Sequence, residues 1–314
     1  MKDGAKILIS SRSFGKTDSG AIELLKDNGL NPILNPYGKK LTEDQIIDLI
    51  DNSVGLIAGT ETISRRVIES NSNLKVISRY GIGLDNVDAI AAKENNIIIY
   101  NTPETPVLAV AELTIALIFS LLRKIRIVDS NLHKDNWKPE IGNTLSEKKI
   151  GIVGLGRIGK KVAIFLKPFN VKIIAFDVKP DKDFAKENDI QVVSFNELLK
   201  QSDIITVHVP LTNDTKYLID KNSFEKMKET AFLINTARGG LVKETDLYKA
   251  LKEGKIAGAA VDVFENEPNI GKLKELDNII LTPHIATYTV ETRKNMELEA
   301  AKNLINGLRR CNAI

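Results

Sequence analysis

The chain has 314 residues, of which 43% are hydrophobic, 44 are basic and 41 are acidic. This length exceeds what one hydrophobic core usually serves, so two domains are expected, and the hydrophobic content is sufficient for both. The charges are dispersed along the chain, which excludes a basic stripe for nucleic acid or for a membrane surface.

The single cysteine, Cys311, excludes an intramolecular disulfide and fits a reducing compartment. Met1 is followed almost directly by a strand-like segment at 6–10, without the apolar core and cleavage site of a signal peptide. The longest apolar stretch, 107–122, is interrupted by Glu112 and is interpreted as a buried crossover helix rather than a membrane span. We therefore expect a cytoplasmic protein.

Short β-rich runs alternate with helical stretches from residue 6 to about 101. Such alternation predicts parallel βα units. Within this series Thr42-Glu43-Asp44-Gln45 is a capping box and predicts the start of a helix. The region from 105 to about 136 is mostly helical by period.

A second series begins with an apolar run at 149–153, followed by Gly154, Gly156 and Gly159 and by a helical segment. In a strand–turn–helix unit, the first of such glycines permits a tight turn, the second lets the backbone approach a pyrophosphate, and the third allows close packing of helix on strand. An ordinary glycine-rich turn is the alternative interpretation of this spacing.

The segment after the glycines favours a cofactor site. A second strand-like run, 171–176, ends at Asp177, about 20 residues past the glycines, where a carboxylate would bind a ribose 2′-hydroxyl. A 2′-phosphate would be repelled there, so NAD is predicted rather than NADP. Lys179 and Lys182 could tolerate a phosphate if Asp177 turned away, and Asp177 could also be a simple turn residue.

The second series continues with four strand-like runs and a last helix at about 289–310; the runs are 203–209, 231–235, 257–261 and 278–281. The predicted fold class is therefore α/β, with two doubly wound parallel-sheet domains joined by two long helices.

Three polar residues follow strands of the second series: Arg238, Glu267 and His284. The planar guanidinium of Arg238 matches a carboxylate with two hydrogen bonds. Histidine exchanges protons near neutral pH, so His284 is the candidate general acid and base, and Glu267 the carboxylate that would orient its ring. A structural histidine at a strand end is the alternative.

The other two histidines have different settings. His208 is interpreted as a cofactor-side or packing residue, and His133 as a surface residue. No metal site is expected from three such separate histidines. No Ser or Cys nucleophile with a neighbouring base is recognisable.

Taken together, these stretches resemble the D-isomer-specific 2-hydroxyacid dehydrogenases, most closely their phosphoglycerate dehydrogenase branch. The motifs follow the family order over nearly the whole chain: Arg79 to Asp88, Asn101-Thr102-Pro103, Ala111 to Thr114, Gly151 to Gly159, His208 to Thr212, Asn235 to Gly240, Asp262-Val263-Phe264, Glu267-Pro268 and Pro283-His284. Their joint presence is specific, whereas any one alone is not.

The resemblance implies a nicotinamide-dependent oxidoreductase in which Arg238 binds the substrate carboxylate and carbonyl oxygen, while Glu267 and His284 transfer the proton. It implies that Asp262 lies near the nicotinamide carboxamide, and that the enzyme is a homodimer through the cofactor domain. The implied cofactor contacts are Gly154, Gly156, Arg157, Ile158, Gly159, Asp177, His208, Val209, Pro210, Thr215, Thr236, Ala237 and Asp262. The implied substrate contacts are Arg79, Tyr80, Gly81, Ile82 and Gly83.

The resemblance also implies a split arrangement. Residues 1–101 and 286–314 would form a flavodoxin-like substrate domain, to which the last helix returns, and residues 102–285 a Rossmann NAD-binding domain. The chain ends at Ile314 without the regulatory extension of longer relatives, so no inhibition by serine is expected.

One position of the sequence bears on which 2-hydroxy acid is the substrate. Many phosphoglycerate dehydrogenases carry an arginine for the substrate phosphate where this chain has Gly59-Thr60-Glu61, and a carboxylate there disfavours a phosphate. Arg79 remains as one possible anionic contact. 3-Phosphoglycerate and 3-phosphohydroxypyruvate, the pair used in serine biosynthesis, lead the expected substrates. Glyoxylate, hydroxypyruvate, D-lactate or a larger 2-hydroxy acid are the alternatives.

A protein of another class also fits the pattern. The C-terminal-binding corepressors share this fold and triad but sense NAD(H) and recruit partners. They carry extra partner-binding segments that are not recognisable in this sequence, so an enzyme is favoured.

Overall fold

The computed structural model describes residues 4–314. The prediction that the chain has no signal peptide rests in part on residues 1–3, which lie outside the described residues. The chain forms two compact units, one containing the residues up to 106 together with 288–314, and the other containing 107–287. The boundaries implied by the resemblance, after 101 and after 285, lie within a few residues of these.

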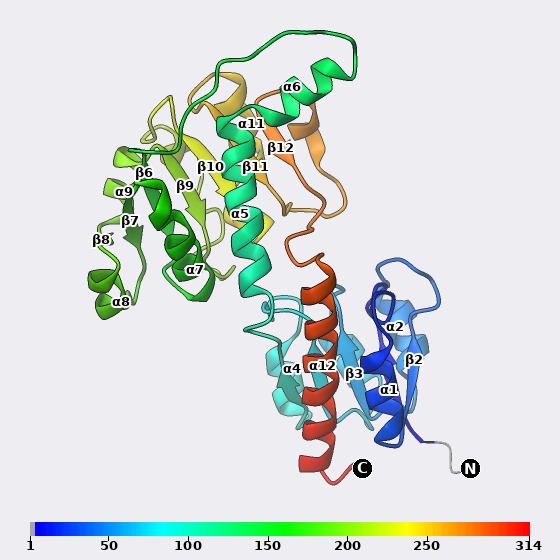
Figure 1. The fold of residues 1–314 in the computed structure, drawn as a ribbon. Coiled ribbons are helices and arrows are strands. Elements are labelled where there is room, and N and C mark those ends of the chain that lie inside the picture. Colours follow the sequence, from blue (N-terminus) through cyan, green and yellow to red (C-terminus); the bar gives the residue numbers. More distant parts are fainter. Residues whose placement is uncertain (1–3) are drawn as a thin grey trace. The chain divides into compact units, whose positions relative to one another are not determined.

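The first unit is built on a five-stranded parallel sheet in the order β2-β1-β3-β4-β5 (Figure 1). Its strands are β1 (Ala5–Ile9), β2 (Leu30–Leu34), β3 (Gly55–Ala58), β4 (Val76–Arg79) and β5 (Ile98–Tyr100). The order is that of a flavodoxin-like sheet, as predicted, and it reverses between β1 and β3.

Helices cover both faces of this sheet. One core layer lies under α1 (Gly20–Asp27) and α12 (Val290–Arg310), and the other under α2 (Glu43–Ile50), α3 (Arg65–Glu69) and α4 (Ala89–Glu94). The last helix therefore packs on the first unit, as predicted. The capping box is also confirmed: Gln45 N–H donates to Thr42 Oγ1, and Thr42 N–H donates to the Gln45 side chain.

The second unit has a seven-stranded parallel sheet in the order β12-β11-β10-β9-β6-β7-β8 (Figure 1). Its strands are β6 (Lys149–Val153), β7 (Lys172–Phe176), β8 (Gln191–Val192), β9 (Ile204–Val207), β10 (Phe232–Asn235), β11 (Gly258–Val261) and β12 (Ile279–Leu281). This is the Rossmann order with one added edge strand, and it reverses between β6 and β9.

One face of this sheet is covered by α5 (Val107–Leu122), α7 (Arg157–Leu166) and α8 (Lys182–Glu187), and the other by α9 (Phe195–Gln201), α10 (Lys221–Phe224) and α11 (Glu244–Lys252). Helix α6 (Ile125–Leu132) follows α5. As predicted for the apolar stretch 107–122, α5 packs against α7 and the sheet. None of the helices in residues 4–314 is both long and apolar enough to cross a membrane.

Candidate active site

The three predicted glycines lie at the reversal of strand order in the second unit. Gly154 has φ +96, and a Cβ added there would lie 2.7 Å from the carbonyl oxygen of His208, at the end of β9. A Cβ on Gly159 would lie 2.0 Å from the carbonyl oxygen of Gly154, so only glycine lets α7 pack this closely. A Cβ on Gly156 would meet nothing within 4 Å. The turn thus leaves open space beside the N-terminus of α7, where a pyrophosphate fits.

The predicted ribose carboxylate is held in place by the backbone. Asp177 Oδ2 accepts from Leu155 N–H at 2.8 Å, and Oδ1 accepts from Lys179 N–H at 2.8 Å. Each carboxylate oxygen has a further lone pair, so both can still accept from a ribose hydroxyl. Arg157 is exposed and Ile158 half-buried at the first turn of α7. The glycine turn and Asp177 together fit a dinucleotide.

The end of β9 presents a neutral histidine to the glycine turn. His208 Nε2 lies 2.8 Å from Thr206 Oγ1, while its buried Nδ1 has no hydrogen-bond partner among the described residues. Burial lowers the pKa of His208 to about 3. His208 is therefore uncharged at neutral pH. Its neighbours Val209, Pro210 and Thr215 form a loop closed by the Thr215 hydroxyl, which donates to Pro210 O at 2.6 Å.

The strands beyond β9 add three more of the predicted cofactor residues. Thr236 Oγ1 lies 3.0 Å from Thr114 Oγ1 on α5, and Ala237 N–H donates to Asn235 Oδ1 at 3.1 Å. Asp262 is fully buried. Burial raises the pKa of the Asp262 carboxyl, against the opposing effect of hydrogen bonds from Thr282 Oγ1 at 2.6 Å and from two backbone N–H groups.

Those two N–H groups belong to Ile285 and Ala286, at 2.8 and 2.9 Å from the Asp262 carboxylate. The backbone of Asp262 also accepts from His284 N–H at 2.8 Å. His284 itself has φ +55, a conformation that few residues other than glycine adopt. Asp262 therefore holds the backbone on both sides of His284, and its predicted contact with the nicotinamide carboxamide stays a prediction.

The structure brings Glu267 and His284 together. His284 Nδ1 lies 2.9 Å from Glu267 Oε1 and 2.9 Å from Oε2, and the two side chains are 35% and 31% exposed. Phe264 N–H donates to Glu267 Oε1 at 3.3 Å and braces the carboxylate. A carboxylate on Nδ1 fixes the tautomer that leaves Nε2 as the nitrogen for a substrate oxygen.

Arg238 lies between β10 and the 3₁₀ turn at 239–241, on a half-buried loop of the same unit. Its Nη1 donates to Ala237 O at 2.7 Å, and its own carbonyl accepts from Asn235 Nδ2 at 2.8 Å. These contacts hold the backbone of the loop and draw the guanidinium back over it. Arg238, Glu267 and His284 thus all follow strands of the same sheet.

The predicted substrate contacts lie in the first unit, in the loop after β4. Gly81 has φ +144, and a Cβ there would lie 2.6 Å from Arg79 Nη1. The backbone at Tyr80 and Ile82 is held in turn: Tyr80 N–H donates to Ala58 O at 2.8 Å, and Ile82 O accepts from Asn101 Nδ2 at 2.7 Å. Gly83 is half-buried. The loop is therefore a fixed backbone turn.

The side chain of Arg79 is only 6% exposed. Its Nη1 donates to the carbonyl of Tyr80, and its Nε donates to Asn86 Oδ1 at 3.1 Å. Both of these contacts are made to residues of the first unit.

The side chain of Glu61 turns inward. It is 2% exposed, and its Oε1 accepts from the Ser10 hydroxyl and from Gly59 N–H at 2.8 Å. The buried carboxyl group of Glu61 therefore lies beside the carboxyl ends of β1 and β3.

Several residues of the site were missed in the sequence. Thr282 orders the Asp262 carboxylate, and Tyr217, Glu244 and Glu265 form hydrogen bonds beside Glu267. A polar residue directly after an apolar strand was the available signal for Thr282. No metal-binding group of three or more His, Cys, Asp or Glu side chains is present in residues 4–314.

Known proteins share both the sequence and the fold of this chain. Residues 115–286 match the family described as D-isomer specific 2-hydroxyacid dehydrogenase, NAD binding domain. A glyoxylate reductase from Thermofilum pendens is 42% identical over 272 residues, covering 84% of this chain and 80% of that protein. The chain belongs to the D-isomer-specific 2-hydroxyacid dehydrogenase family. The resemblance seen in the motifs is confirmed, and NAD is the cofactor of the second unit.

Other relatives of this chain carry different names. A D-3-phosphoglycerate dehydrogenase from Archaeoglobus fulgidus is 37% identical over 291 residues, covering 91% of this chain and 55% of that protein. The chain thus spans about half the length of that relative. The structure of a D-lactate dehydrogenase from Aquifex aeolicus complexed with NAD and lactic acid has a TM-score of 0.83 and 29% identity, covering 95% of this chain and 93% of that one.

Proposed function

We propose that this chain catalyses the NAD-dependent interconversion of a D-2-hydroxy acid and its 2-oxo acid. The observation that carries the proposal is the bifurcated contact of His284 Nδ1 with both Glu267 oxygens, at 2.9 Å each, directly after a strand of the NAD-binding sheet. Such a pair is the arrangement of a histidine that gives and takes a proton.

The residues have separate roles in this proposal. In reduction of the 2-oxo acid, His284 Nε2 gives a proton to the carbonyl oxygen while Glu267 stabilises the imidazolium from the other side. The guanidinium of Arg238 binds the substrate carboxylate and polarises the carbonyl. The bound cofactor supplies the hydride for the carbonyl carbon. In the oxidative direction His284 takes the proton of the hydroxyl.

Among the substrates considered, the geometry best supports unphosphorylated small 2-oxo acids such as glyoxylate and hydroxypyruvate. The buried carboxylate of Glu61 repels a phosphate near the ends of β1 and β3. Arg79, the expected anionic contact, is 6% exposed and bonded to Tyr80 and Asn86. The name of the Thermofilum pendens relative agrees with this class.

3-Phosphohydroxypyruvate, the leading substrate from the sequence, is the second candidate. It is supported by the 37% identity to the Archaeoglobus fulgidus phosphoglycerate dehydrogenase. Exposed Arg12, in the loop after β1, is a second possible phosphate contact.

A substrate panel separates the two candidates. NADH oxidation would be followed with glyoxylate, hydroxypyruvate, 3-phosphohydroxypyruvate, pyruvate and 2-oxoglutarate, and with NADPH in parallel. We expect kcat/KM for hydroxypyruvate to exceed that for its 3-phosphate by at least about tenfold. In Glu61→Gln this ratio should fall, because the charge is removed while an oxygen acceptor for Gly59 N–H is kept. A preference of the wild type for 3-phosphohydroxypyruvate would assign the chain to phosphoglycerate oxidation instead.

We also propose that the NAD-binding unit pairs with a second copy of the chain. The support is a set of exposed apolar residues on α6 and the segment after it: Ile125 is 50% exposed, Leu132 52%, Trp137 88% and Ile141 92%. Large exposed apolar groups mark association surfaces. Sedimentation equilibrium would give the mass of a dimer, and a monomer at micromolar concentration would contradict the pairing.

A further inference from the structure

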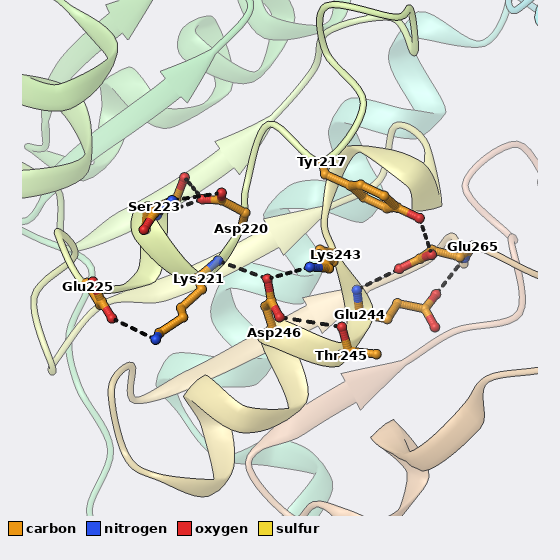
Figure 2. Close-up of polar contacts among 11 residues, drawn as sticks. Tyr217, Asp220, Lys221, Ser223, Glu225, Lys243, Glu244, Thr245, Asp246 and Glu265 are labelled. Atoms are coloured by element: carbon orange, nitrogen blue, oxygen red, sulfur yellow. Dashed lines mark hydrogen bonds and ion pairs between the residues drawn. The ribbon is translucent and has the colours of Figure 1, made fainter.

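Three residues outside the predicted site are joined by hydrogen bonds, and Figure 2 shows them; we call Tyr217, Glu244 and Glu265 the Glu265 cluster. Glu244 N–H donates to Glu265 Oε1 at 2.7 Å, and Glu265 N–H donates to Glu244 Oε1 at 2.5 Å. The Tyr217 hydroxyl donates to Glu265 Oε2 at 2.9 Å. Each carboxylate thus caps the backbone of the other residue.

The cluster joins three segments of the second unit. Tyr217 lies in the loop after β9, Glu244 is the first residue of α11, and Glu265 follows β11. The contacts bridge 21 and 48 positions of the chain, so they fix tertiary geometry rather than one local turn.

Glu265 stands at the base of the turn that carries Glu267. Asn269 N–H donates to Asn266 O at 2.6 Å and closes the turn, while Phe264 N–H reaches Glu267 Oε1 at 3.3 Å. A shift of the backbone at Glu265 would therefore move the carboxylate that holds His284.

The loop of Arg238 packs on the same backbone. A Cβ on Gly239 would lie 2.0 Å from the carbonyl carbon of Phe264 and 2.5 Å from Glu265 N, so the two loops are in direct backbone contact. Tyr217 N–H donates to Gly240 O at 2.8 Å. Tyr217 thus bonds to both loops, by its backbone to the one after Arg238 and by its hydroxyl to the one before Glu267.

The electrostatics of the cluster are unfavourable on their own. Burial raises the pKa of Glu244, and the charges of Glu265 and Glu267 raise it further. The hydrogen bond to Glu265 raises the pKa of the Tyr217 hydroxyl, which keeps it a protonated donor. Specific hydrogen bonds hold the three neighbouring carboxylates together despite their repulsion. Removing one of these hydrogen bonds should therefore change the geometry of the cluster.

We propose that Tyr217, Glu244 and Glu265 are positioning residues that set Glu267 and Arg238 in register for reaction. The proposal rests on the proposed function, because it takes the Glu267–His284 pair as the proton-transferring pair. The cluster acts through the backbone and through Glu267 and touches no substrate.

The test compares the cluster with a matched pair in the same unit. Tyr248 Oη donates to Glu275 Oε2 at 3.2 Å in an exposed contact, and neither residue adjoins the site. We expect Glu265→Ala to lower kcat about tenfold with KM for NADH unchanged, and Tyr217→Phe to lower kcat about threefold. Glu265→Gln should stay within threefold of the wild type, because its amide can still bond to Glu244 N–H and to Tyr217. Glu275→Ala and Tyr248→Phe should leave kcat unchanged.

A double variant identifies the mechanism. In the Glu265→Ala background, Tyr217→Phe should have no further effect on kcat, since its partner is already absent. Additive losses, or a loss of kcat in Glu275→Ala as large as in Glu265→Ala, would overturn the proposal.

A second readout does not depend on turnover. The chain has three histidines, so ¹⁵N-histidine NMR gives three pairs of imidazole signals, one for Nδ1 and one for Nε2 of each ring, and His284→Gln assigns the pair of His284. The Nδ1 shift of His284 should move in Glu265→Ala and not in Glu275→Ala. An unmoved signal overturns the positioning role. If the wild type reduces none of the acids while the signal moves as expected, the proposed function fails and the positioning of His284 stands.

Discussion

Both units reverse their strand order beside their first strand, between β1 and β3 in the first unit and between β6 and β9 in the second. Open parallel sheets bind ligands outside the carboxyl ends of the strands at such a reversal. In the second unit this place is left open by Gly156, whose added Cβ would meet nothing within 4 Å. In the first unit the carboxylate of Glu61 occupies it, 2% exposed and bonded to Ser10 and Gly59.

The difference shows that the crevice at a strand reversal can either bind an anion or repel one. A crevice lined by glycines exposes backbone N–H groups to an anion, whereas one filled by a carboxylate has its N–H groups already satisfied and repels anions. Removing the carboxylate would leave Gly59 N–H with only the Ser10 hydroxyl oxygen at 3.4 Å and the Ser10 hydroxyl with only Ile57 O at 3.2 Å, at a cost of about 1 kcal/mol. Glu61 therefore stabilises the loop after β3 through its hydrogen bonds and also repels anions.

The largest effect is expected at the proposed proton donor of the second unit. His284→Ala should lower kcat about 100- to 10,000-fold, the range that a general acid contributes, with affinity for NADH kept. Turnover with 2-oxo acids and NADH fluorescence titration would measure the two quantities. His133→Ala is the control, because that side chain is 80% exposed. Retained turnover in His284→Ala would mean that another group supplies the proton.

The open crevice of the second unit can be tested with two neighbouring glycines. Gly159→Ala should cost about 3 kcal/mol or more of unfolding free energy, because its Cβ would lie 2.0 Å from a backbone oxygen. Gly156→Ala has the room and an ordinary φ of −78, so its stability should change by less than about 1 kcal/mol. Its affinity for NADH should nevertheless fall at least about tenfold, because the methyl group fills the space of the pyrophosphate.

Thermal unfolding and NADH titration of both variants would check this contrast. Equal destabilisation by the two substitutions, or unchanged NADH affinity in Gly156→Ala, would contradict the assignment of the open space to the cofactor.

Much of the fold could be predicted because the buried parallel strands are short apolar runs with clear helical periods between them. The strand β8, Gln191–Val192, gave no such signal, since both residues are exposed. Helix α4 has six residues, three of them alanine, and its hydrophobic period is too short to distinguish. The capping box at Thr42 was readable because its contacts lie within four consecutive residues.

The site was predictable in part for the same reason. Arg238 and His284 each follow an apolar strand directly, so the sheet alone places them. The Glu265 cluster depends on contacts 21 and 48 positions apart, and no local pattern encodes these. The direction of a side chain is equally hidden in sequence: Glu61 was expected to disfavour a phosphate at its position, but its burial against Ser10 could not be predicted.

The unfolding free energy of the two units should also differ in its dependence on acid pH, because only the second unit contains a histidine beside its crevice. Burial lowers the pKa of His208 from 6.5 to about 3. As pH falls below 6.5 the unfolded chain gains a proton that the folded chain does not, so the stabilisation by His208 is complete above this pH and is lost toward pH 3. Between pH 7 and pH 5 the loss amounts to about 2 kcal/mol.

The change His208→Gln isolates this contribution, since glutamine keeps a polar partner for Thr206 and does not titrate. Its unfolding free energy should fall by about 2 kcal/mol less than that of the wild type between pH 7 and pH 5. The comparison with the wild type is needed because burial raises the pKa values of Glu244, Asp262 and Glu297, and these groups change stability in the opposite direction as pH falls. Amide hydrogen exchange in β6 and β9 measures the stability of the second unit directly. If the wild type and His208→Gln showed parallel curves of stability against pH, His208 would take up its proton in the folded state.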